Sequence, residues 1–135
     1  MLNERSAINK IKLKFEKIDR VVIISLLTGG FFSARMTEEG VMVDNLGFYP
    51  FLPWKVFTEA INLLIRNSGR VEKGEAMSSR LGEEGLELET LEGHVAHFVY
   101  GRKIGETVFR RISPISAILV WAGVCDATTD ELILR

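Results

Sequence analysis

Two histidines and four basic residues are the side chains of this sequence whose types and spacing could do chemistry. His94 and His97 stand three residues apart, so on a helix both rings could reach one metal ion, with Glu92 or Asp126 adding an oxygen ligand. The two rings would lie about 60° apart on a helical wheel, and no acidic residue follows at the four-residue spacing of a metal-binding helix. We therefore expect surface or half-buried histidines with no metal or cofactor, and a metal-dependent enzyme at His94 and His97 is the third interpretation.

The four basic residues are Arg102, Lys103, Arg110 and Arg111. They flank a predicted turn and strand, so they could form a patch on one side of a hairpin and neutralise the phosphates of a nucleic acid. The chain has 17 Lys and Arg against 18 Asp and Glu, and its net charge of -1 offers no general attraction for a polyanion. DNA binding would therefore depend on this local patch.

Catalytic nucleophiles and phosphate-binding loops are not indicated by the sequence. No serine or cysteine falls in a recognisable nucleophile motif. Gly29-Gly30 follows an apolar run but lacks the further glycine and the Lys-Ser/Thr of a phosphate loop, so we interpret it as a hairpin turn. The sequence therefore favours a protein that is not an enzyme.

The composition predicts a single folded domain over residues 1–135. Its 47% of apolar and 26% of charged residues are ordinary globular values. Cys125 is the single cysteine, which excludes an internal disulfide and is typical of a cytoplasmic protein. The longest apolar runs, residues 21–27 and 115–124, are shorter than the roughly 20 residues of a membrane span, so we expect no membrane partner.

The first part of the chain is predicted to be a helix followed by a small sheet. Apolar residues recur at three- and four-residue intervals over residues 6–18, which predicts a helix capped by Ser6, although alternation in its second half leaves a strand open. Residues 20–27, 31–36 and 41–43 then have the composition of an antiparallel three-stranded meander. We expect the aromatic cluster that follows to plug the space between sheet and helix, with a ligand-stacking surface as the alternative; its members are Phe48, Tyr49, Phe51 and Trp54.

The second part is predicted to be mainly helical. Residues 53–67 are an amphipathic helix closed by Gly69, and residues 75–81 are either a short helix or a mobile surface segment. Another helix begins after the N-cap Thr90 and ends at Gly101, with a buried stripe of Leu91, Val95, Phe98 and Val99. Opposite that stripe we expect an uncharged interaction face formed by Gly93, His97 and Tyr100.

The end of the chain is less uniform. Residues 106–112 alternate like a strand, and residues 132–134 suit a short edge strand. Residues 115–124 suit both a helix that starts at Ser113-Pro114 and a buried strand, and we favour the helix. Together the elements predict an α+β fold, with an N-terminal antiparallel β-meander packed on a helical C-terminal half.

This order of elements resembles the winged-helix output domains of bacterial response regulators. In that family a small antiparallel sheet precedes a helix that ends in a Gly-Arg-Val turn, here Gly69-Arg70-Val71, and two more helices and a hairpin follow. The resemblance covers residues 31–112 and implies a winged-helix-like C-terminal half, a role in DNA binding or transcription regulation, and a recognition helix at residues 91–100. Glu89 and Glu92 at the start of that helix have the same sign as DNA phosphates.

A second resemblance covers residues 95–108. This stretch of helix, glycine turn and strand is similar to part of the isomerase-like C-terminal domain of bacterial Gre-type transcript cleavage factors, which implies a protein-interaction surface. The first functional hypothesis is therefore a non-enzymatic binding module, directed to DNA or regulatory. The alternative is a protein-interaction or self-assembly domain, such as a homodimer, that uses the apolar side chains of Phe48, Tyr49, Tyr100 and Trp121.

Overall fold

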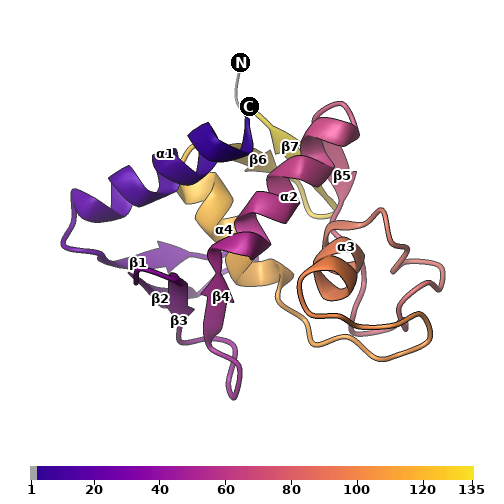
Figure 1. Cartoon of the computed structure of the whole chain (residues 1–135). Coiled ribbons are helices and arrows are strands. Elements are labelled where there is room, and N and C mark those ends of the chain that lie inside the picture. Colours follow the sequence, from indigo (N-terminus) through magenta and orange to yellow (C-terminus); the bar gives the residue numbers. More distant parts are fainter. Residues whose placement is uncertain (1–2) are drawn as a thin grey trace.

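A computed structural model describes residues 3–135 and has the α+β architecture that the sequence predicts, with an N-terminal meander followed by helices (Figure 1). A four-stranded sheet lies on one side of the molecule, and α3 with two long loops lies on the other, with α2 and α4 between them. The described elements, in chain order, are α1 (Glu4–Glu16), β1 (Val21–Ser25), β2 (Phe31–Met36), β3 (Gly40–Val43), β4 (Phe51–Pro53), α2 (Trp54–Arg66), β5 (Arg70–Glu72), α3 (Leu91–Phe98), α4 (Ile112–Trp121), β6 (Cys125–Ala127) and β7 (Glu131–Leu134).

Helix α1 starts three residues earlier than the sequence predicts. Its N-cap is Asn3, whose side chain accepts a hydrogen bond from the Ser6 N–H at 2.8 Å, while the Ser6 hydroxyl accepts one from the Asn3 N–H at 2.9 Å. Ser6 is therefore the second partner of a capping box and not the cap itself. The helix is continuous to Glu16, so the helical prediction is confirmed and the strand alternative is wrong.

The N-terminal sheet has the order β1-β2-β3-β4, and all its pairs are antiparallel. The predicted three-stranded meander is confirmed, and β4 adds a fourth strand by pairing Leu52 with Val41. Gly40 is required where β3 pairs with β4, because a Cβ there would overlap the Leu52 carbonyl oxygen. One face of the sheet is buried, and β1 lies at an edge.

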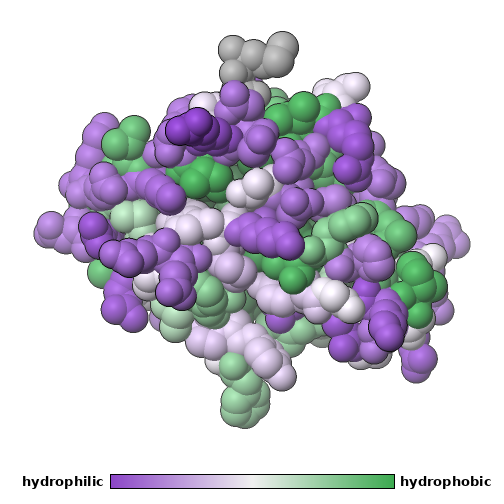
Figure 2. All heavy atoms as spheres, in the orientation of Figure 1, coloured by the Kyte–Doolittle hydropathy of each residue, from purple (hydrophilic) through white to green (hydrophobic). Residues whose placement is uncertain are grey.

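The loop between β3 and β4 projects from the body of the molecule, and its tip is hydrophobic (Figure 2). Phe48 in this loop is 97% exposed, and Tyr49 is also exposed. Phe51 and Trp54 are half-buried, and the Trp54 indole N–H donates to the Glu38 carbonyl at 3.0 Å. The predicted aromatic plug is therefore wrong for Phe48 and Tyr49.

Helix α2 is the central element, and it confirms the amphipathic helix predicted for residues 53–67. It buries Val56, Phe57, Ala60, Ile61 and Leu64, and it packs against α1 and α3. A turn through Ser68 and Gly69, both at positive φ, then leads into β5. The buried residues of the sheet, α2, α4 and the C-terminal strands form one continuous hydrophobic cluster, so both halves of the fold share a core.

The segments between β5 and α3 and between α3 and α4 contain neither a helix nor a strand. The short helix offered for residues 75–81 and the strand predicted for residues 106–112 are both wrong. Gly82 and Gly85 adopt positive φ and turn the first segment back on itself. The two loops bond to each other instead, since Leu81 donates to the Glu106 carbonyl and Gly105 donates to the Leu81 carbonyl. They enclose a small second cluster of Leu81, Leu86, Ala96 and Val108.

The chain ends with α4 and a hairpin. Residues 112–121 are helical, which confirms the favoured interpretation, and the predicted strand at residues 132–134 is confirmed as part of β7. A second, three-stranded sheet has the order β5-β7-β6. Helix α4 packs against both β1 and β6, and this position explains why it is buried on most sides. None of the helices that the structure describes is long and apolar enough to span a membrane.

Candidate functional site

Of the four predicted nucleic-acid-binding residues, Arg111 is the one that is withdrawn from the surface. Arg111 is only 8% exposed, and its guanidinium carbon lies 3.7 Å from the centre of the Tyr100 ring. The Arg102 side chain donates two hydrogen bonds to the Thr107 carbonyl, at 3.1 and 2.8 Å. Lys103 and Arg110 remain exposed. Arg111 is therefore the buried centre of an aromatic cluster, and nucleic-acid binding by Arg102, Lys103 and Arg110 stays a prediction.

The predicted interaction face on α3 is largely covered. Gly93 is buried, and a Cβ at this position would overlap the Glu87 carbonyl oxygen. Tyr100 is half-buried under Arg111, and the half-buried His97 uses its Nδ1–H to bond the Arg102 carbonyl at 2.8 Å. Phe98, which was expected in the buried stripe, is 49% exposed. The helical wheel failed here because the loops before and after α3 fold over the side that the pattern assigns to solvent.

The two histidines contact different partners. His94 is buried, and its Nε2 lies 3.0 Å from Glu59 Oε1 on α2, whereas His97 bonds the backbone of Arg102. Within residues 3–135 no group of three or more His, Cys, Asp or Glu side chains is placed to hold a metal ion. Their geometry is that of two packed side chains, and the expected surface or half-buried position is wrong for His94.

Glu92 connects α3 to the start of α4. Its buried carboxylate accepts hydrogen bonds from the Arg111 N–H at 3.0 and 3.1 Å and from the Ile112 N–H at 3.1 Å. These N–H groups have no partner within the helix, so Glu92 caps α4 from another element. Burial raises the pKa of Glu92 to about 7, although the hydrogen bonds from Arg111 and Ile112 act in the opposite direction. Glu92 thereby fixes the position of residues 110 and 111, which lead into α4.

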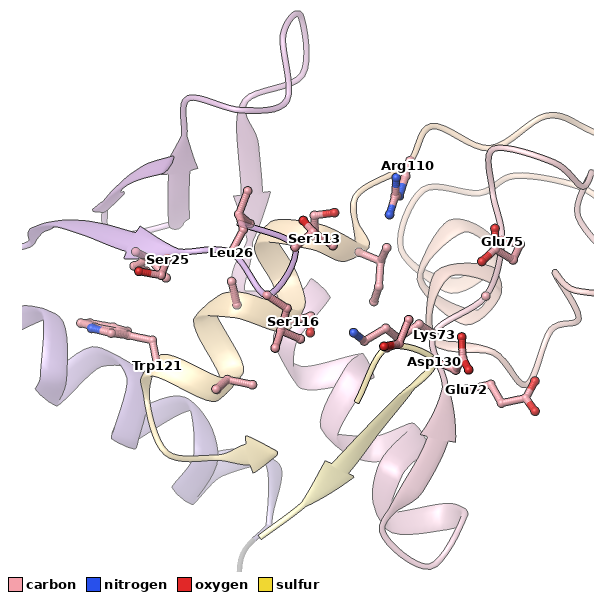
Figure 3. Close-up of a pocket in the computed structure, with 18 of the residues that line it drawn as sticks. Ser25, Leu26, Glu72, Lys73, Glu75, Arg110, Ser113, Ser116, Trp121 and Asp130 are labelled. Atoms are coloured by element: carbon pink, nitrogen blue, oxygen red, sulfur yellow. The ribbon is translucent and has the colours of Figure 1, made fainter. Parts of the chain in front are cut away.

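A groove lies between β1 and α4, with a volume of about 650 Å³ (Figure 3). One wall is the end of β1 with the turn that follows, and the other is the face of α4 that repeats at helical spacing. This volume falls within the usual range for small-molecule and peptide sites. The apolar part of its lining includes Ile23, Leu26, Leu27, Ala117, Val120 and Trp121.

Two positive charges lie at one end of the groove. The Lys73 amino group and the Arg110 guanidinium both point into it, and Lys73 points toward Ser116 (Figure 3). The Lys73 amino group donates one hydrogen bond, to the Thr128 carbonyl at 2.7 Å. Among residues 3–135, neither Lys73 nor Arg110 has a carboxylate within ion-pair distance. Both cations therefore have donors left for a ligand.

The pKa of Lys73 reflects this environment. Burial lowers it below the ordinary value for lysine, the nearby Asp130 carboxylate raises it, and the Arg110 charge lowers it by a smaller amount. Glu72, Glu75 and Asp130 also line this end, and of these the Glu72 side chain points away from the groove (Figure 3). An anionic group placed between Lys73 and Arg110 would offset the repulsion between the two cations.

Ser116 is the most informative side chain in the groove. It is only 4% exposed, and its Oγ has no hydrogen-bond partner in the described chain. A buried hydroxyl without a partner costs free energy that a bound polar atom would recover. Ser113, one turn earlier on α4, adds a second hydroxyl to the same groove. The groove thus combines apolar walls, the Ser113 and Ser116 hydroxyls of α4 and the two cations, and its lining also includes Glu75 and Asp130.

Among these polar residues, only Arg110 is a site residue predicted from the sequence. Lys73 lies in a segment that has no clear periodicity, and Ser116 lies in one of the most apolar stretches of the chain. The spacing of Ser113, Ser116 and Val120 within that stretch was an available signal of a helix face with polar residues along one edge.

A scan against protein-family models, a search of curated proteins and a search of solved structures each find no match to this chain.

Proposed function

We propose that this protein is a non-enzymatic cytoplasmic binding module whose ligand lies in the groove between β1 and α4. The observation that carries this proposal is the buried, unpartnered Ser116 hydroxyl, which lies in one cavity with the unpaired Lys73 and Arg110. An apolar body with an anionic group is the ligand chemistry that satisfies all three features. Ser116 has no histidine or carboxylate bonded to it, so it lacks the activation that a catalytic nucleophile needs.

A fluorescent probe of this chemistry, 1-anilinonaphthalene-8-sulfonate, tests the proposal by titration. We expect saturable binding of one molecule per chain, and we expect Lys73→Met with Arg110→Met to weaken it by about tenfold because the sulfonate loses two charge-assisted hydrogen bonds. Lys103→Met is the matched control, since Lys103 is exposed but does not line the groove. Phe48→Ser controls for binding at the exposed loop. Equal binding to all variants, or no saturable binding, would refute the proposal.

DNA binding is the second candidate, and the topology of the second half favours it. Helix α2, strand β5, helices α3 and α4, and the β6–β7 hairpin follow the order of the winged-helix resemblance, and the sheet order is β5-β7-β6. Because residues 75–81 are not helical, the third helix of this series is α4 and not α3. We therefore propose α4, in place of residues 91–100, as the recognition helix of this candidate.

The chemistry of α4 ranks DNA behind the groove ligand. The helix contains no Arg, Lys, Asn or Gln to read base edges, and the face it leaves open lines the groove beside β1. A mobility-shift assay at several salt concentrations, with Lys103→Ala and Arg110→Ala, separates the candidates. Salt-sensitive binding that these variants weaken supports the DNA hypothesis, and absence of binding at low salt removes it.

A further inference from the structure

Strand β1 has a free backbone edge. The Arg20 carbonyl accepts from the Met36 N–H at 2.8 Å, and the Leu26 N–H donates to the Gly30 carbonyl at 3.0 Å. Because antiparallel pairing alternates, the even-numbered residues of β1 bond to β2, and the N–H and C=O groups of Val21, Ile23 and Ser25 point away from it. Nothing in residues 3–135 pairs with these three residues on that side.

This edge faces the groove. Ile23 and Ser25 belong to the groove lining, and α4 lies across the groove from Ser25 (Figure 3). Ile23 is 65% exposed although its side chain is apolar. An edge strand with unpaired backbone groups and exposed apolar side chains is a template for an added strand. The five residues of β1 offer roughly 17 Å of edge, enough for a short extended peptide.

The charges indicate which part of a polypeptide fits. Strand β1 runs toward the end of the groove where Lys73 and Arg110 lie (Figure 3). A peptide added parallel to β1 would have its C-terminal end at these two cations. A main-chain carboxylate is the group that continues the axis of such a strand, and it accepts from ammonium and guanidinium donors. The Ser116 hydroxyl lies midway along α4, where it can hydrogen-bond the main chain of a peptide in the groove.

We propose that the groove binds the C-terminal segment of another polypeptide as an added fifth strand on β1, with its terminal carboxylate between Lys73 and Arg110. This inference rests on the proposed function and names its ligand. The backbone groups of Ile23 and Ser25 hold the peptide main chain, and alternate apolar side chains of the peptide pack on Ala117, Val120 and Trp121 of α4. Selectivity for a free chain end follows from the two cations.

Two pools of synthetic hexapeptides test the role of the carboxylate. Both have apolar residues at alternate positions, and they differ only in a free or an amidated C-terminus. By fluorescence anisotropy we expect the free-acid pool to bind about tenfold more tightly, and we expect Lys73→Met with Arg110→Met to abolish the difference. Lys103→Met is again the control. Equal affinity of the two pools, or binding of neither, overturns the proposal.

The role of the β1 edge is tested by Ile23→Pro against Ile23→Ala. Proline removes an N–H that points away from β2, so the pairing of β1 with β2 is retained, whereas alanine keeps the N–H and removes only the side chain. We expect the proline variant to lose about tenfold in peptide affinity and the alanine variant clearly less. Equal losses contradict edge pairing.

Amide hydrogen exchange of the unmodified protein gives the same information if Ile23→Pro fails to fold. Exchange at Val21, Ile23 and Ser25 should slow when the free-acid peptides bind, and unchanged exchange overturns the proposal. The outcome also separates the two proposals. If the naphthalene sulfonate binds in the groove but the peptides do not, the strand-addition proposal fails and the binding-module proposal stands; if neither binds, both fail.

Discussion

The carboxylate of Glu92 accepts the backbone N–H of Arg111 at 3.0 Å, and this bond joins the start of α3 to the start of α4 across a long loop. Both residues are buried, and neither performs the surface role that its charge suggests in the sequence. Arg110, one residue earlier, is left exposed at the end of the groove. The position of that cation therefore depends on a buried acid on a different helix.

Glu92 makes stability depend on pH. Its pKa is raised from 4.5 to about 7 in the folded chain, so the folded state holds this proton more tightly than the unfolded state. The contribution is fully present below about pH 4.5 and is lost as pH rises through 7. We expect the free energy of unfolding of the native protein to fall by up to about 3 kcal/mol from pH 5 to 8 relative to Glu92→Gln, whose side chain does not titrate. Urea unfolding at several pH values measures this, and parallel pH profiles of the two proteins would contradict it.

Arg111 stabilises the fold by stacking and not by binding a partner. Replacing it with lysine keeps the charge but removes the flat guanidinium from the Tyr100 ring, so Arg111→Lys should lower the free energy of unfolding by about 1–2 kcal/mol. Lys103→Arg, an exchange at an exposed position, should change it by less than about 0.5 kcal/mol. Chemical denaturation compares the two, and an Arg111→Lys variant as stable as the native protein would refute the stacking role.

Gly93 is needed because α3 packs closely on the preceding loop. Gly93→Ala should destabilise the protein by about 3 kcal/mol or more, since the added methyl group overlaps the Glu87 carbonyl oxygen and α3 must move. Gly29→Ala is a useful comparison: a methyl group there meets open space, so only its positive φ imposes a cost, on the order of 1 kcal/mol. If thermal unfolding shows Gly93→Ala to be the milder of the two, the close packing of α3 is wrong.

The Ser116 hydroxyl should lower the stability of the free protein and strengthen ligand binding. Ser116→Ala removes a buried hydroxyl that has no partner, and we expect it to raise the free energy of unfolding by about 1 kcal/mol while weakening ligand binding in the groove. Ser113→Ala, which removes a more accessible hydroxyl, should leave stability nearly unchanged. Denaturation and probe titration of both variants check this. A destabilised Ser116→Ala protein would mean that the hydroxyl already has a structural partner.

Local patterns predicted the regular elements well. The spacing of Ile11 and Phe15 on α1, and of Phe57, Ile61 and Leu64 on α2, indicates helices because burial of one face repeats every turn. The hairpin at Gly29-Gly30 follows from turn chemistry in the same way. These features depend on residues close together in the chain, and for this reason a single sequence contains them.

The errors and the site depend on contacts between distant parts of the chain. Residues 106–112 alternate like a strand, but their backbone is held by Leu81 and Glu92 instead of a neighbouring strand. Nothing near Ser116 in the sequence indicates that Lys73 lies in the same cavity, since the two are joined only by the packing of α4 between the two sheets. The charge of Arg110 is visible in the local sequence, but its place beside Lys73 in the groove is not.

The groove itself is tested most directly by mapping amide chemical shifts of isotope-labelled protein during titration with 1-anilinonaphthalene-8-sulfonate. We expect the shifted signals to cluster at residues 23–28 of β1 and its turn, at Lys73, and at residues 113–121 of α4. Shifts confined to the β3–β4 loop around Phe48, with β1 and α4 unchanged, would show that the binding surface lies elsewhere and would contradict the proposed function.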